Sequence, residues 1–314
     1  MKDSYNLVIG NNRLKYEFIL RRQITVIKGD SGTGKSTLVD MFNQIYKEKR
    51  TGLHCNLSDK LIVLDNPKNW KDLIISNKNK IFIADEDSEF VQTQEFAQYV
   101  QNSDNYFIFI TRSGRMIWLT YSVNDIYELQ TTKDEHGNFI TSLYSRYFET
   151  KHTINPDLII TEDSNSGKEM FDLVLGHNVT SACGKDKIYN VLKDSKFNFA
   201  YIIVDGSAFG SCIGKLLNKF GEKICIFAPE SFEYLLLNTS VFNKYVFNEL
   251  RNTENYCDSK IFISWERYYT KLLSDLCLKF YGFTYTKSKL QQFFKTDIFI
   301  TEIRNQITDD IIGV

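Results

Sequence analysis

The chain has 314 residues, of which 43% are apolar and 25% are charged, as in globular proteins with a substantial core. This length suits two domains of ordinary size. The formal net charge of −1 gives no overall electrostatic attraction for DNA or RNA, so any contact with nucleic acid would have to be local.

Cysteine usage and hydropathy favour a cytoplasmic protein. The six cysteines include no C-x-x-C pair and the four histidines are dispersed, so a zinc site is not expected. Free thiols in a reducing compartment are the simpler interpretation. The N-terminus has no apolar signal core, and no apolar run approaches the length of a membrane span. We therefore expect a cytoplasmic protein with no membrane partner.

The most specific motif lies near the N-terminus. Residues 7–18 predict a β-hairpin that turns at Gly10-Asn11-Asn12, and residues 24–27 predict a short buried strand. Residues 29–37 then fit the phosphate-binding loop pattern G-x-x-x-x-G-K-[ST] at every fixed position, and residues 36–46 predict a helix. Glycines let successive N–H groups surround phosphates, and a helix N-terminus adds partial positive charge. A plain turn between a strand and a helix is the alternative.

The motif predicts a nucleoside triphosphate ligand, with ATP and Mg²⁺ as the expected cofactors. Lys35 is expected to contact the terminal phosphates, and the Ser36 hydroxyl is expected to bind Mg²⁺. The candidate nucleotide-binding residues are Gly29, Asp30, Ser31, Gly32, Thr33, Gly34, Lys35, Ser36 and Thr37.

An acidic pair follows a later predicted strand. Residues 61–64 predict a strand, residues 70–76 a helix, and residues 81–84 a second strand that ends in Asp85-Glu86. Four apolar residues followed by Asp-Glu resemble a Walker B element. In that interpretation Asp85 holds the water shell of Mg²⁺ and Glu86 polarises the attacking water. The alternative is a helix cap followed by an acid in the first turn.

A further predicted strand, residues 106–110, ends in Thr111 and Arg112. In P-loop ATPases a polar residue at this position often senses the γ-phosphate, which makes Thr111 a candidate. Arg112 or Arg115 is a candidate arginine finger, in cis or toward a neighbouring subunit, although loop arginines are usually only solvated. The hairpin before residues 29–37 resembles the entry into ABC-type ATPase domains. No LSGGQ-like signature follows the motif, however, so an ABC-type sandwich dimer is in doubt.

The pattern changes after a second predicted hairpin, residues 125–132 with 139–147. Residues 151–156 interrupt the pattern of predicted strands and helices. We place the domain boundary there, with one domain at 1–153 and the other at 154–314. The second domain is expected to be a largely parallel α/β sheet with C-terminal helices.

Acidic residues follow the predicted strands of the second domain. Residues 158–161 lead into Glu162-Asp163, and residues 201–204 lead into Asp205-Gly206. Residues 223–227 lead into Pro229-Glu230, with Glu233 beyond, and residues 261–264 are predicted as a strand before Glu266. Ligands of open α/β sheets bind at the carboxyl ends of strands, so we expect a Mg²⁺ site with Glu162, Asp205 and Glu230 as candidate ligands. The alternative is that these acids cap helices.

Glu162 and Asp205-Gly206, with Gly184-Lys185 between them, resemble the Toprim fold of topoisomerases, primases and OLD-family nucleases. The resemblance implies that Glu162 is an acid/base and that Asp205 is the first Mg²⁺ ligand of a D-x-D pair. Ser207 stands where the second Asp is expected. Either Glu230 or Glu233 compensates for it, or the site is degenerate and does not cleave.

The predicted fold is therefore α/β, with an N-terminal P-loop NTPase domain (an ABC/AAA-like core with β-hairpins) followed by a Toprim-like α/β domain. A P-loop ATPase joined to a Toprim domain is the arrangement of OLD-family nucleases and related phage-defence systems, and this chain resembles a pared-down relative. Residues 205–210 and 229–233 also resemble uncharacterised ATPases of bacterial mobile elements.

Two functions of different classes remain open. The first is an ATP hydrolase coupled to a Mg²⁺-dependent site that cleaves nucleic acid, with DNA as the candidate partner. The second is a non-nucleolytic ATP-dependent switch whose second domain binds a protein partner. In either case we expect a protein partner or a homo-oligomer. A small-molecule kinase is disfavoured, because the hairpin after Thr111 does not resemble an arginine-bearing lid.

Overall fold

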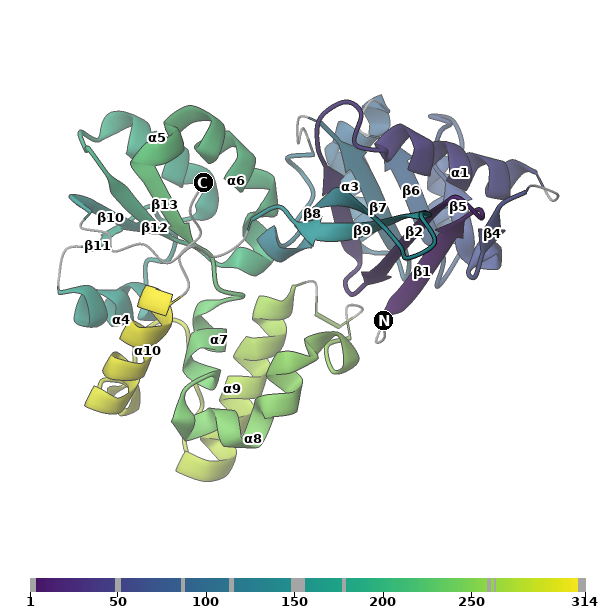
Figure 1. The fold of residues 1–314 in the computed structure, drawn as a ribbon. Helices are drawn as coiled ribbons and strands as arrows, with labels where there is room; N and C mark the ends of the chain where they lie inside the picture. Colours follow the sequence, from purple (N-terminus) through teal and green to yellow (C-terminus); the bar gives the residue numbers. More distant parts are fainter. Residues whose placement is uncertain are drawn as a thin grey trace. The chain divides into compact units, whose positions relative to one another are not determined.

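The computed structural model describes residues 4–48, 52–85, 88–112, 116–147, 156–176, 179–258, 261–262 and 264–309. Over these residues the protein has an α/β fold with a nine-stranded mixed sheet and a four-stranded parallel sheet. The chain divides into two compact units, Met1–Arg146 with Glu254–Ile263 and Tyr147–Thr253 with Ser264–Val314 (Figure 1). The predicted boundary between residues 153 and 154 falls within 148–155, outside the described residues.

Five neighbouring strands of the nine-stranded sheet run parallel, in the order β5, β6, β7, β3, β8. β3 (Ile24–Lys28) lies between β7 (Tyr106–Thr111) and β8 (Ile126–Lys133). On the other side of β7, β6 (Ile81–Asp85) is followed by β5 (Leu61–Val63). Strand β7 thus separates the strand that leads into residues 29–37 from the strand that ends in Asp85.

The two predicted hairpins complete this sheet. β1 (Tyr5–Gly10) pairs antiparallel with β2 (Leu14–Leu20), and the Asn11 side chain accepts hydrogen bonds from two N–H groups of their turn. β8 pairs antiparallel with β9 (Phe139–Ser145). In their turn the Asp134 carboxylate accepts from the N–H groups of His136 and Asn138. β9 lies parallel to β2, and the short β4 (His54–Cys55) pairs with β1 at the sheet edge.

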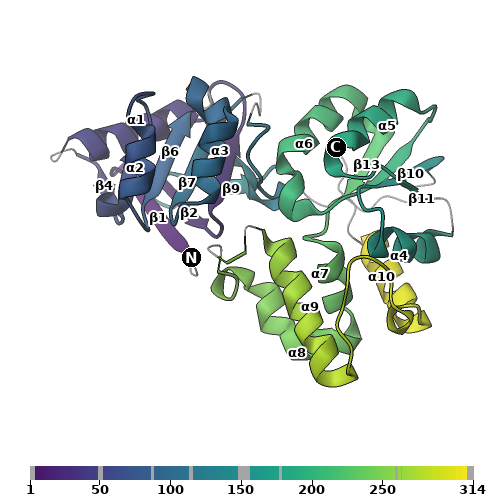
Figure 2. The same cartoon turned by 180° about the vertical axis from the view of Figure 1, so that it is seen from behind.

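The central strands are buried on both faces, as expected for parallel strands between helices. Ile83 and Ile108 share one core cluster with Leu38 and Phe42 of α1 (Lys35–Lys47). Phenylalanines at the alternate positions of these strands lie on the opposite face of the sheet. The rings of Phe82 and Phe107 stack there, with centroids 5.3 Å apart. α2 (Trp70–Ser76) and α3 (Gln94–Gln101) pack on that aromatic face (Figure 2). The predicted strands and helices of this half are confirmed.

The second unit contains the four-stranded sheet, in which all strands are parallel and the order is β11, β10, β12, β13. The strands are β10 (Leu158–Thr161), β11 (Val179–Ser181), β12 (Ala200–Ile203) and β13 (Ile224–Phe227). The intervening helices are α4 (Ser166–Leu175), α5 (Ile188–Asp194) and α6 (Gly206–Phe220). The predicted parallel sheet is confirmed, and β11 is an edge strand that the sequence analysis did not predict.

Helices from the C-terminal part of the chain pack beside this sheet (Figure 1). They are α7 (Phe232–Leu237), α8 (Ser240–Arg251), α9 (Trp265–Tyr281) and α10 (Asp297–Asp309). Leu236 of α7, Leu273 of α9 and Ile303 of α10 belong to one core cluster with Phe227 of β13. The Arg304 guanidinium also donates to the backbone carbonyl of Val174, 3.0 Å away, which ties α10 to the end of α4. This packing brings α7, α9 and the segment after α9 close to the strand ends.

The prediction of a strand at residues 261–264 is wrong for Ile261, Phe262 and Ser264, and Ile263 lies outside the described residues. The N–H groups of Ile261 and Phe262 both donate to the carbonyl of Asp258, which makes a turn, and the Ile261 side chain is exposed. Ser264 is the residue before α9, so Glu266 lies in the first turn of a helix rather than after a strand. A short apolar run does not distinguish a strand from a turn that leads into a helix.

The apolar side chains of α9 divide between the core and the surface. Leu273 and Leu276 of α9 are buried, and Leu272 packs against the same core. Phe280 is exposed and its ring stacks on Tyr245, with centroids 4.3 Å apart. In the part of the chain that the structure describes, no helix is both long enough and apolar enough to span a membrane.

Candidate functional sites

The loop between β3 and α1 requires glycine for geometric reasons. Gly32 and Gly34 have φ values of +85° and +90°, which L-residues with side chains rarely adopt. A Cβ atom on Gly34 would also lie 2.9 Å from the hydroxyl oxygen of Tyr16, and that hydroxyl donates to the Gly34 carbonyl over 2.8 Å. Tyr16 of β2 therefore supports the loop from the hairpin, a contact that the motif alone could not reveal.

Lys35 is the first residue of α1, and its ammonium is directed back onto the loop. Its Nζ donates to the carbonyls of Gly29 and Asp30 over 2.5 Å each, and to Oγ1 of Thr33 over 3.0 Å. The residue is only 6% exposed, whereas Ser36 and Thr37 in the same helical turn are exposed. The loop therefore surrounds a cationic group with polar oxygens, and the next two residues of the helix are exposed.

The predicted partners of this loop lie at the same edge of the sheet. Thr111 at the end of β7 pairs in register with Lys28, the residue before the loop, and Asp85 of β6 pairs with Ile110. Because these strands are parallel, their carboxyl ends share one edge. Thr111 is buried at 1% exposure and Asp85 is half-buried. Glu86 and Arg115 lie outside the described residues, and Arg112 is exposed.

Glu162 and Asp205 follow neighbouring strands of the second sheet, as predicted. β10 pairs with β12, and the Glu162 N–H donates to the Ile203 carbonyl over 3.1 Å. A backbone hydrogen bond from Asp205 acts on the Glu162 carboxylate. Gly206 is required next to Asp205, because a Cβ atom there would lie 2.2 Å from the carbonyl oxygen of Ala228. The two acids are therefore fixed side by side at adjacent strand ends.

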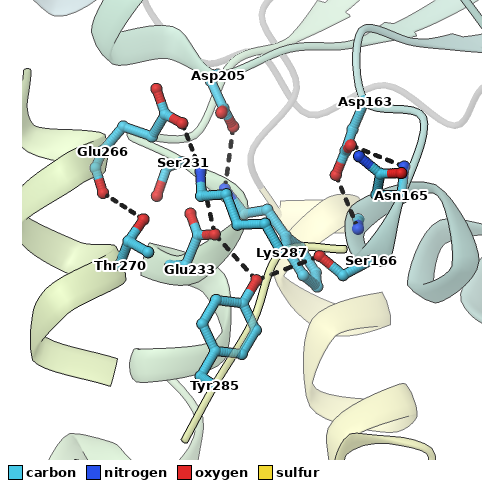
Figure 3. A network of polar contacts seen from close by, with 12 residues as sticks. Asp163, Asn165, Ser166, Asp205, Ser231, Glu233, Glu266, Thr270, Tyr285 and Lys287 are labelled. Carbon is cyan, nitrogen blue, oxygen red and sulfur yellow. Dashed lines mark hydrogen bonds and ion pairs between the residues drawn. The ribbon is translucent and has the colours of Figure 1, made fainter. Parts of the chain in front are cut away.

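Two helices and a C-terminal segment add further charged groups (Figure 3). Glu233 comes from α7 and Glu266 from α9, and their charges act on Asp205 together with that of Glu162. The Lys287 ammonium lies 2.5 Å from Oε1 of Glu266 and 3.2 Å from Oε1 of Glu233. We call Glu162, Asp205, Glu233 and Glu266 the carboxylate cluster.

Burial and mutual repulsion make the carboxylate cluster hard to ionise. Burial raises the pKa of Glu162 from 4.5 to about 7, although the positive charge of Lys185 opposes the shift. Burial also raises the pKa of Asp205 well above its ordinary value, and Glu162, Glu266 and Glu233 raise it further. Burial raises the pKa of Glu233 as well. The cluster thus has less compensating positive charge than its acids require.

Several buried oxygens near these acids make no hydrogen bond. They are Oε2 of Glu162, Oε2 of Glu233 and the hydroxyl oxygen of Ser207. Buried polar atoms are normally paired, so an unpaired group of oxygens indicates a site for a cation or a water. Oxygen donors of this kind are the ligands that Mg²⁺ prefers. Within the described residues, however, no three His, Cys, Asp or Glu side chains are already arranged to hold a metal ion.

The structure distinguishes between the two acids of residues 230–233. Glu233 is 1% exposed and its charge acts on Asp205. Glu230 is half-buried, and its backbone carbonyl accepts from the Ser207 N–H over 3.2 Å. Metal binding by the Glu230 side chain stays a prediction. The sequence named Glu233 only as an alternative to Glu230, because burial cannot be read from the sequence. Lys287 has no sequence signal, because its role depends entirely on the tertiary fold.

The helix-capping interpretation is correct for some residues and accounts for only part of the cluster, in which Oδ1 of Asp205 accepts from the Phe232 N–H at the start of α7 over 3.0 Å. The Asp163 carboxylate accepts from the N–H groups of Asn165 and Gly167 at the start of α4. The Ser231 hydroxyl accepts from the Tyr234 N–H and caps α7. Capping of this kind explains why Asp163 and Ser231 occur where they do. It does not explain the unpaired buried oxygens of Glu162 and Glu233.

Lys185, predicted as part of a Gly-Lys pair, lies near the same strand ends. Its Nζ donates to the Ala208 carbonyl over 2.8 Å, and its charge favours the ionised form of Glu162. The molecule is thus an α/β protein with two candidate sites, a lysine-bearing loop in the first unit and a carboxylate cluster in the second.

Comparisons with known proteins identify no relative. No protein-family model matches the chain. Searches among curated proteins and among solved structures give no significant match. The function proposed below therefore depends on the residues of this chain and their geometry.

Proposed function

We propose that the first unit binds and hydrolyses ATP at the carboxyl edge of the nine-stranded sheet. The observation that supports this most is the common edge of β3, β7 and β6, to which the Lys35 loop, Thr111 and Asp85 all belong. A strand, a glycine-rich loop and a helix in this order form an anion-binding site, because the loop N–H groups and the helix N-terminus are both electropositive.

Each residue then has a defined task. The loop N–H groups and Lys35 bind the phosphates, which replace the carbonyls of Gly29 and Asp30 as partners of the ammonium. Ser36 and Asp85 hold Mg²⁺, whose charge offsets that of the phosphates. Thr111 orients the terminal phosphate from the end of β7. Glu86 polarises the attacking water, and Arg112 stabilises negative charge in the transition state.

The test is nucleotide binding and phosphate release by the full chain and by Lys35→Met. Loss of a charge-assisted contact should weaken ATP binding at least about tenfold. Lys47→Met is the matched control, since Lys47 is in the last turn of the same helix and its ammonium contacts Asp65 at the surface. Equal ATP binding by both variants and the unchanged chain would rule out this site.

We further propose that the second unit is a Toprim-like, Mg²⁺-dependent site that cleaves nucleic-acid phosphodiesters, as in the OLD-family nucleases. The adjacency of Glu162 and Asp205 on β10 and β12 supports this. Asp205 would hold the metal, and Glu162, with a pKa of about 7, suits a group that takes up and releases a proton near neutral pH. Glu233 supplies the carboxylate that is missing at Ser207. A role in phage defence or mobile-element biology, in the cytoplasm, fits this combination.

Supercoiled plasmid with Mg²⁺ or Mn²⁺, with and without ATP, tests the second proposal. Nicking should require both Glu162 and Asp205, so Glu162→Ala and Asp205→Ala should abolish it. Glu222→Ala, at an exposed acid of the same unit, is the control and should cleave normally. Cleavage that survives both substitutions would exclude this site.

A non-nucleolytic switch is the second candidate function, and one observation favours it. The Lys287 ammonium already bridges two acids of the carboxylate cluster, as a structural ion pair would. In this case the second unit binds a protein partner and plasmid is never cleaved, although ATP binds. Stimulation of ATP turnover by DNA would argue against the switch.

A further inference from the structure

The segment between α9 and α10 contacts the carboxylate cluster at several points. Lys287 bridges Glu266 and Glu233, and the Tyr285 hydroxyl donates to the same Glu233 oxygen over 2.9 Å (Figure 3). The Lys287 carbonyl accepts from the Ser166 N–H over 3.2 Å, which fixes the segment against α4. The backbone at Lys287 is therefore fixed against α4, and its side chain reaches the cluster from there.

The charges around Lys287 do not balance. Four carboxylates face two ammonium groups, and that of Lys185 is already engaged with the Ala208 carbonyl. Oε2 of Glu233 and the Ser207 hydroxyl are without partners, although these residues are only 1% and 5% exposed. A buried unpaired carboxylate oxygen is unfavourable, so the cluster would gain free energy from a further cation.

The two sides of the Lys287 ion pair differ in their access to water. The Lys287 side chain is 43% exposed, whereas Glu233 is almost completely buried. The ammonium can therefore move into solvent at a small desolvation cost, but the carboxylate cannot follow. If the lysine leaves, the acids are uncompensated unless another cation replaces it.

We propose that the Lys287 ammonium competes with a divalent cation for Asp205, Glu233 and Glu266, so that metal binding displaces the Lys287 side chain from the cluster into solvent. The inference rests on the proposed metal site of the second unit and adds a regulatory element to it. An event that withdraws the Lys287 ammonium raises metal affinity, and an event that holds it in place lowers metal affinity.

The first experiment measures Mn²⁺ binding to the full chain by calorimetry. Lys287→Met keeps the apolar stem and removes the competing charge, so the dissociation constant should fall at least about tenfold. Lys289→Met is the matched control, because Lys289 is an exposed lysine two residues further on, and it should bind as the unchanged chain does. Glu233→Gln combined with Lys287→Met should abolish the gain. Unchanged or weaker Mn²⁺ binding by Lys287→Met overturns the inference.

A second measurement needs no substitution. Saturating Mg²⁺ should increase the acylation of Lys287 by an amine-reactive reagent, read by mass spectrometry, while labelling of Lys289 stays constant. Equal labelling of Lys287 with and without Mg²⁺ overturns the inference, even if Lys287→Met fails to fold.

Failure of the inference and failure of the proposed cleavage give different results. Tighter Mn²⁺ binding by Lys287→Met without plasmid nicking upholds the competition and removes the nuclease. Plasmid nicking by the unchanged chain, with no gain in Mn²⁺ affinity in Lys287→Met, upholds the nuclease and overturns the competition.

Discussion

Each unit contains a lysine ammonium at its candidate site, but the surroundings of the two differ. Lys35 donates to oxygens of the loop that immediately precedes it in the chain. Lys287 is held by carboxylates from two helices that are distant from it in sequence. The N–H groups of a glycine-rich loop and a helix N-terminus attract an anion, whereas a group of carboxylates attracts a cation. The first arrangement therefore suits phosphate binding, and the second suits the exchange of one cation for another.

The strongest test of this comparison is at Gly34. Gly34→Ala would force a side chain into φ +90° and place Cβ 2.9 Å from the Tyr16 hydroxyl, so we expect loss of nucleotide binding and about 1–2 kcal/mol of destabilisation. Gly137→Ala is the control, since Gly137 has φ +82° but no atom within 4 Å of its Cβ position. It should lower thermal stability to a similar extent and leave nucleotide binding unchanged. Normal nucleotide binding by Gly34→Ala would contradict the role of the loop.

The next test concerns which acid belongs to the carboxylate cluster. Glu233→Gln removes a buried charge that acts on Asp205, and we expect Mn²⁺ affinity to fall at least about tenfold. Glu230→Gln should change this affinity by less than about twofold, because the acids that act most strongly on Asp205 are Glu162, Glu266 and Glu233. The opposite ranking in a calorimetric titration would show that the sequence prediction of Glu230 is right and that Glu233 is structural.

A third test uses pH in the absence of divalent cations. The pKa of Glu162 is about 7 in the folded chain and near 4.5 when unfolded, so its contribution to stability is complete below pH 4.5 and is lost as pH rises to 7. Asp205 and Glu233, whose pKa values are also raised, act in the same direction. Melting temperature should therefore fall over this range, and Glu162→Gln should flatten the profile.

Mg²⁺ supplies the control for the pH experiment, because a bound cation stabilises the ionised cluster and should reduce the loss of melting temperature. Asp134, Asp157 and Glu169 do not interfere in this window. Hydrogen bonds from Asn138, Asn198 and Lys295 lower their pKa values, so their contributions are lost only at more acidic pH. A melting temperature that rises steadily from pH 5 to 7 would contradict the assignment of Glu162.

The smallest expected effect is at Tyr16. Tyr16→Phe removes the hydrogen bond to the Gly34 carbonyl but keeps the ring in the core, so ATP binding should weaken by about fivefold, equivalent to about 1 kcal/mol. Stopped-flow measurement of the dissociation rate of a fluorescent ATP analogue would detect this change. An unaltered rate would mean that the loop keeps its shape without support from the hairpin.

The sequence predicted the local features of both units well. Alternating or continuous apolar runs located most strands, and Gly-Asn-Asn and Asp134–Asn138 located the hairpin turns. The failure at residues 261–264 has a physical cause. An apolar run of four residues has no periodicity to distinguish it, and only the hydrogen bonds to Asp258 decide its conformation.

What the sequence by itself determined is the chemistry that depends on neighbouring residues, above all the glycine-rich loop whose lysine, hydroxyls and helix N-terminus are contiguous. It also placed Glu162 and Asp205 after strands, since strand ends can be read locally. Only the tertiary structure decided the strand order that brings Asp85 and Thr111 to that loop, and the packing that brings Glu233, Glu266 and Lys287 to Asp205. The physical reason is that helix docking is set by the summed apolar contacts of α7, α9 and α10, which no local pattern of charged residues encodes.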